Sequence, residues 1–71
     1  MGAHMSSRVN TGDKVRLRGF QPMSTMEHYE GATGTVVDIE ANRNMGDVIF
    51  VQLDNETDKV IQTRRQFCEK E

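Results

Sequence analysis

Short runs of alternating apolar and polar residues constrain the fold of this chain more than any other feature. Residues 14–18 (KVRLR) and 47–55 (DVIFVQLDN) both alternate with a period of two. This period is typical of β-strands with one face in a core and the other in water. Turn-forming residues separate the runs at close spacing, and no segment has a clear helical period. The pattern therefore predicts an all-β domain.

Four segments are expected to form strands, namely residues 14–18, 35–39, 47–55 and 60–63. A last segment follows, with Phe67 filling the core. The side chains expected to face the core from the first three strands are Val15, Leu17, Val37, Ile39, Ile49, Val51 and Leu53. A small all-β chain hides its sheet edges most simply by curling into a barrel. The prediction is a small SH3-like barrel of four to five short strands, with a long loop after the first strand.

The long loop covers residues 19–30 (GFQPMSTMEHYE). Pro22 prevents a regular ladder, and one helical turn is expected over residues 24–28. Gly31 ends the loop and Gly34 opens the next strand, where the backbone must turn tightly or pass close to another strand. Long loops on small rigid barrels commonly carry recognition, so we expect the partner to bind here.

Length and charge limit the kind of protein further. Seventy-one residues form one small domain, and a net charge of -2 lacks the strong positive field of a dedicated nucleic-acid binder. No apolar stretch of about 18 residues and no signal-peptide pattern occurs, so no membrane partner is expected. The only cysteine, Cys68, cannot form an internal disulfide, which fits a reducing cytoplasm. The opening MGAHM is interpreted as a cloning remnant, with residues 1–10 as a flexible N-terminus and residues 11–71 as the barrel domain.

Three motifs resemble the SH3-like barrels of the electron-transport-accessory group. They are GDKVRL (12–17), YEGATGTV (29–36) and VQLD (51–54), and the resemblance covers nearly all of the chain from Thr11 onward. The group includes the β-subunit barrel of nitrile hydratase, the small stromal subunit of photosystem I and the variable chain of ferredoxin-thioredoxin reductase. The resemblance implies a non-catalytic accessory module that braces or docks onto a larger protein.

Two other families are similar in parts of the chain. EGATGTVVDI (30–39) is similar to the core of KOW modules, which implies RNA or protein binding. Type II dihydrofolate reductases are similar in length and strand layout, which implies an enzyme with one pore built from four copies, centred here on Gln62 and Ile61. Their late strand carries Val-Gln-Ile-Tyr, whereas this chain has VIQT (60–63) and lacks the tyrosine.

The leading hypothesis is a protein-binding or accessory module, with self-association through a two-fold contact as one form. The alternation places Val48, Phe50 and Gln52 on the outward face of their strand. An outward aromatic residue often marks an interface, and the alternative is that the long loop covers Phe50. The residues expected to contact a partner are Phe20, Met23, Met26, Tyr29, Val48 and Phe50.

A second hypothesis is nucleic-acid binding through a basic strand face. The candidate residues are Lys14, Arg16, Arg18, Arg64 and Arg65. They form either a patch for phosphates or an acidic partner, or a solvated face that opposes edge-to-edge association. With no Trp, one Tyr and three Phe, the chain has few aromatic residues on which bases could stack.

No residue set predicts an active site or a metal site. His28 stands beside Glu27 and Glu30, but no second His or Cys has the spacing of a tetrahedral metal set. Carboxylates in loops are usually solvated, and nothing in the sequence predicts a buried acid-base pair. We therefore expect no catalytic residue, no metal, no cofactor and no small-molecule substrate.

Overall fold

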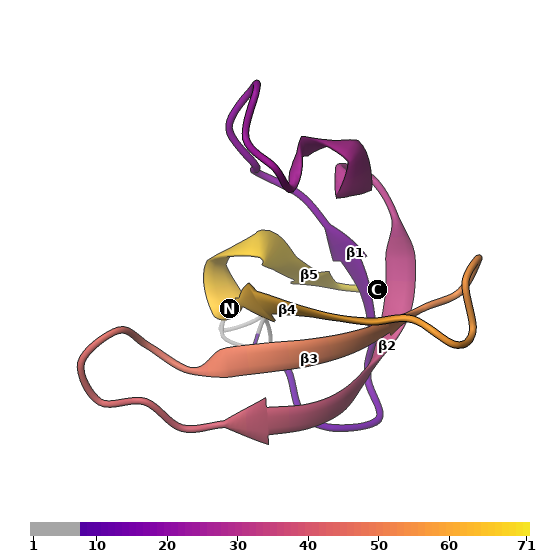
Figure 1. Ribbon diagram of the computed structural model, residues 1–71. Helices are drawn as coiled ribbons and strands as arrows, with labels where there is room; N and C mark the ends of the chain where they lie inside the picture. The colour runs from indigo at the N-terminus through magenta and orange to yellow at the C-terminus, as the bar shows by residue number, and fades with distance from the viewer. Residues whose placement is uncertain (1–7) are drawn as a thin grey trace, which may run out of the picture.

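The computed structural model describes residues 8–71, which form one five-stranded antiparallel sheet (Figure 1). The strands are β1 (Lys14–Leu17), β2 (Thr33–Glu40), β3 (Val48–Leu53), β4 (Val60–Arg64) and β5 (Cys68–Lys70). Two short 3-10 helices are η2 (Glu27–Tyr29) and η3 (Arg65–Phe67). The predicted all-β class is confirmed. None of the helices in residues 8–71 has the length and apolar character needed to cross a membrane.

The strand order is β4-β3-β2-β1-β5, so the first and last strands are neighbours. Within residues 8–71, β4 and β5 lie at the two ends of the sheet and do not pair with each other. Figure 1 shows a strongly twisted sheet in which η3 carries the chain from β4 to β5. Because β4 and β5 do not pair, the sheet stays open, and the expected closure into a barrel is not observed.

The core lies on the concave face of the twisted sheet. The buried apolar residues are Val9, Val15, Leu17, Tyr29, Val36, Ile49, Val51, Leu53, Ile61 and Cys68. The alternation of β1 and β3 is confirmed, since every second residue of each strand is buried. Val9 also belongs to this core, although the expected domain begins at residue 11. The sequence did not indicate this, because a single apolar residue in a polar segment gives no periodic signal.

The prediction for β2 is partly wrong. Val36 is 1% exposed and Val37 is 40% exposed, so Val36 faces the core instead of Val37. The register shifts between Val36 and Asp38, which is a β-bulge that leaves Val37 without a partner on β3. After the extra residue, the side chains of β2 again point as expected, and Ile39 pairs with Ile49 and packs against the core.

The end of the chain also differs from the expectation. Phe67 lies in η3 and is only half-buried, whereas Cys68 is in the core opposite Leu17 of β1. The prediction that Phe67 fills the core is therefore wrong, because η3 interrupts the strand alternation just before β5. Phe67 stacks instead on Phe20 of the long loop, with 4.7 Å between the ring centroids.

The long loop is held in place at its base. The Glu30 carboxylate accepts hydrogen bonds from the backbone N–H groups of Gly19 and Phe20, at 3.0 and 2.9 Å. The expected helical turn is present as η2, one turn near the end of the loop, and Tyr29 at its end is buried in the core. The loop is therefore an ordered wall beside the sheet.

Candidate functional site

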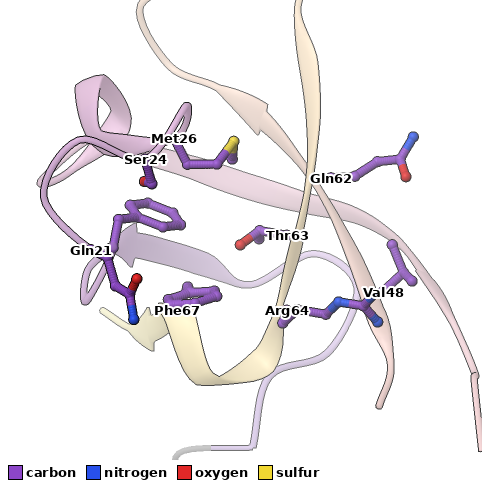
Figure 2. Close-up of a pocket in the computed structure, with 9 residues that line it drawn as sticks. Gln21, Ser24, Met26, Val48, Gln62, Thr63, Arg64 and Phe67 are labelled. Carbon is purple, nitrogen blue, oxygen red and sulfur yellow. The ribbon is translucent and has the colours of Figure 1, made fainter. Parts of the chain in front are cut away.

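A pocket of about 430 Å³ lies between the long loop and the free edge of β4 (Figure 2). Its lining residues are Phe20, Gln21, Ser24 and Met26 from the loop, Val48 from β3, Gln62, Thr63 and Arg64 from β4, and Phe67 from η3. No strand of residues 8–71 pairs with β4 on this side, so the open edge of the sheet forms one boundary of the pocket.

Most of the pocket wall is apolar. Phe20 and Phe67 form the aromatic part, with their rings stacked at an angle of 29°. Met26 packs against the core beside them, and its thioether adapts to irregular aromatic surfaces. Figure 2 shows Met26, Thr63 and Phe67 reaching the same space from three separate elements.

Thr63 is the buried polar residue of this wall. Its side chain is on the inward face of β4 with Ile61, and the residue is only 6% exposed. The Oγ1 atom is buried and has no hydrogen-bond partner among residues 8–71. Figure 2 shows the hydroxyl directed toward the side of the pocket that holds Met26 and Phe67. A buried polar group without a partner is costly, and because this atom is closed to solvent, a ligand in the pocket does not reach it in this arrangement.

Arg64 lies next to Thr63 but belongs to the other face of β4. Its Nη1 donates hydrogen bonds to the carbonyl oxygens of Met45 and Gly46, at 3.1 and 2.9 Å. No carboxylate of residues 8–71 forms an ion pair with Arg64. A guanidinium has five N–H donors, so the fixed Arg64 retains donors and an uncompensated charge at the pocket rim.

The residues expected to contact a partner lie in four different places. Phe20, Met26 and Val48 come together at the pocket. Tyr29 is part of the core, and Met23 is 92% exposed near the tip of the loop. Phe50 is half-buried on the outward face of β3, between Asp38 of β2 and Gln62 of β4. The aromatic residues of the loop pack at sites other than Phe50: Phe20 stacks on Phe67, and Tyr29 lies in the core.

The basic candidates are mostly paired with carboxylates. The ion pairs are Lys14 with Asp54 (2.8 Å), Arg16 with Glu71 (3.4 Å), Arg18 with Glu69 (3.0 Å) and Arg65 with Asp47 (3.0 Å). The hydrogen bond and charge of Glu69 raise the pKa of Arg18 above its usual value. The sheet order also separates Arg64 on β4 from the three cations of the β1 segment by two intervening strands.

The residues considered for catalysis or metal binding do not converge. Ile61 is buried, whereas Gln62 is exposed at the pocket rim, so the two lie on opposite faces of β4. The carboxylates of Glu27 and Glu30 accept hydrogen bonds from the loop backbone. Residues 8–71 contain no group of three side chains that could hold a metal ion.

Comparisons with known proteins do not assign this chain to a family. No family model matches it, and no curated protein or solved structure is similar to it. The functional proposal therefore depends on the pocket itself.

Proposed function

We propose that this chain is a non-catalytic protein-binding module that holds part of a partner protein in the pocket between the 19–30 loop and β4. The observation that carries the proposal is the pocket itself, which combines an apolar wall with a few polar groups at fixed positions. Its size falls in the range typical of binding sites. The Phe50 face of β3 extends the proposed surface, since Val48 lines the pocket and points to the same side as Phe50.

The order of the loop supports this role. The hydrogen bonds of Glu30 at the loop base and the stacking of Phe20 on Phe67 hold the pocket wall before any partner arrives. A wall that is already ordered loses less conformational entropy on binding. A preformed pocket is therefore better suited to recognition than a loop that must fold around its partner.

We propose further that the domain is an SH3-like barrel with an accessory role in the cytoplasm. The five short antiparallel strands, the loop after β1 and the pairing of β1 with β5 support this architecture. The resemblance to the electron-transport-accessory group supports a docking role rather than catalysis, and the free thiol of Cys68 fits a reducing compartment. The nucleic-acid hypothesis has less support, because carboxylates accompany most of the basic candidates.

The proposal is tested by selecting a displayed library of random seven-residue peptides against the wild-type domain. The blocking variant is Gln62→Arg, which places a longer charged side chain at the exposed rim of the pocket. The matched control is Gln66→Arg, because Gln66 is also exposed and lies outside this pocket. We expect peptides that bind the wild type and the Gln66 variant but not the Gln62 variant. Peptides that bind all three proteins equally, or no enrichment at all, would refute the proposal.

A further inference from the structure

The two edges of the sheet are protected to different degrees. β5 is three residues long and carries Glu69 and Lys70, which form ion pairs with Arg18 and Asp13. Short length and charge are the usual means of preventing another strand from pairing with an edge. β4 has five residues, VIQTR, without a proline, without a bulge against β3 and with its single charge at the end. The edge beside the pocket is therefore the edge that can accept a strand.

We propose that the free edge of β4 binds an extended peptide of a partner protein, in which an acidic residue directly precedes an aromatic residue. This inference rests on the proposed function, because it specifies the chemistry of the same site. The peptide would add a sixth antiparallel strand, with backbone hydrogen bonds to β4 and side chains in alternate positions.

The position opposite Thr63 determines the aromatic residue. Residues directly opposite each other in antiparallel strands point to the same face, so this peptide side chain enters the pocket with Thr63. Phe20, Met26 and Phe67 provide aromatic and thioether contacts for a ring. An aromatic ring fills this apolar space better than an aliphatic side chain, because it can also pack against the Phe20 and Phe67 rings.

The position opposite Arg64 determines the acidic residue. In an antiparallel pair the residue opposite Arg64 precedes the residue opposite Thr63 in the peptide, and its side chain points to the same face as Arg64. The remaining N–H donors of Arg64 then meet a carboxylate, which removes the uncompensated charge at the rim.

A second copy of this chain is a poorer occupant of the same edge. β4 (VIQTR) contains no carboxylate, so a second β4 strand cannot meet the charge of Arg64 in any register. β4 also contains no aromatic residue that could enter the pocket. These two features favour a foreign peptide.

The first test is the sequence of the peptides enriched in the library selection. We expect Asp or Glu directly before an aromatic residue, and backbone amides of β4 that become protected from hydrogen exchange when such a peptide is added. N-methylation of alternate peptide amides should abolish binding only at the amides that face β4. The opposite residue order, or protection confined to other strands, would overturn the inference.

The second test is a double-mutant cycle measured by calorimetry on one enriched peptide. Replacing its acidic residue by the corresponding amide, or Arg64→Gln in the protein, should each weaken binding by about 2- to 5-fold, and the two together should weaken it no further. The exposed control Arg43→Gln should leave the binding unchanged.

The outcomes separate this inference from the proposed function. Peptides that are blocked by Gln62→Arg but bind Arg64→Gln as tightly as the wild type would overturn the inference and leave the proposed function standing. Peptides indifferent to Gln62→Arg would overturn both. A dimer whose β4 amides are protected at high protein concentration without peptide would also overturn the inference.

Discussion

Gly34 of β2 lies so close to Gln52 of β3 that a Cβ atom at Gly34 would be 2.5 Å from the Gln52 carbonyl oxygen. It would also be 2.6 Å from a methyl group of Val51. Gly31, three residues earlier, has open space around it and a φ of +84°. The two glycines therefore serve different purposes, since Gly31 allows a left-handed turn and Gly34 allows two strands to approach.

Alanine substitutions should distinguish these purposes. Gly34→Ala should lower the free energy of unfolding by about 2 kcal/mol or more, because the β2 and β3 backbones must move apart. Gly31→Ala should lower it by about 1 kcal/mol through its positive φ, and Gly31→Asn by less. Urea denaturation of the three variants measures the differences. A Gly34→Ala variant as stable as the wild type would contradict the close approach of β2 and β3.

The ion pair of Asp54 predicts a dependence of stability on acid. Hydrogen bonds from Lys14 and Thr33 lower the pKa of Asp54 below 3.8, its value in an unfolded chain. A depressed folded pKa stabilises the protein above pH 3.8, and this contribution is lost as the pH falls through the folded value. Asp54→Asn should therefore be less stable than the wild type at pH 7, and the difference should shrink below pH 4. Urea midpoints at pH 7, 4, 3 and 2 measure this.

The matched control for Asp54 is Asp58→Asn. Asp58 is an exposed carboxylate in the next turn and forms no ion pair within residues 8–71. Its removal should leave the difference between pH 7 and pH 3 unchanged. If both variants responded to acid in the same way, the Lys14–Asp54 contact would not be the source.

The buried thiol of Cys68 predicts the opposite dependence at alkaline pH. Burial raises the pKa of Cys68 from 9.0 to about 11, against a smaller opposing effect of Arg65. The stabilisation is complete below pH 9 and is lost as the pH rises toward 11, by on the order of 2 kcal/mol. Iodoacetamide at pH 8 should label Cys68 slowly in the native protein and rapidly in urea. Labelling at equal rates in both conditions would contradict the burial of Cys68, and Cys68→Ala should have a weaker alkaline dependence.

The paired cations predict that the wild-type protein does not bind nucleic acids. Wild-type protein titrated with labelled RNA and DNA at low salt should show no binding, because Glu69 and Glu71 accompany Arg18 and Arg16. The double variant Glu69→Gln with Glu71→Gln exposes both guanidinium groups and should bind weakly, with an affinity that falls as salt rises. Salt-dependent binding by the wild type would instead favour the nucleic-acid hypothesis.

Phe50 provides a test of the surface outside the pocket. Because Phe50 is half-buried between Asp38 and Gln62, Phe50→Ser should lower the free energy of unfolding by about 1–2 kcal/mol. Short peptides selected for the pocket should bind this variant within about 2-fold of the wild type, because Phe50 does not line the pocket. Light scattering reports the oligomeric state. If a wild-type dimer became a monomer with Phe50→Ser, Phe50 would instead be a contact between copies.

Strong alternation made β1 and β3 predictable from the sequence, whereas β2 was only partly predictable. A run of β-branched residues such as Val36-Val37 has no polar partner to mark its phase, and the bulge reverses the direction of every side chain before it. The prediction for the end of the chain was wrong for a related reason. No pattern in the neighbouring residues indicates that η3 precedes Cys68. The sequence therefore favours the larger aromatic Phe67 over Cys68 as the core residue.

The sequence indicated the loop wall of the pocket but not the β4 wall. Loop length and apolar content singled out Phe20 and Met26, yet Thr63 and Arg64 became neighbours of the loop only through the three-dimensional path of the chain. A signal for Thr63 was present, because a period of two from Ile61 places it inward. A polar residue at a core position is the kind of local inconsistency that often marks a functional site.

The two edges of the sheet are protected to different degrees, and this limits the formation of fibres by this domain. A fibre could grow only if the free edge of β4 paired with β5 of the next copy. That strand is three residues long and carries Glu69 and Lys70. Pairing of β4 with β5 of the next copy, and with it the growth of a fibre, is therefore opposed at every junction. The domain can thus keep one edge free for a peptide without the tendency to aggregate that usually accompanies a free strand edge.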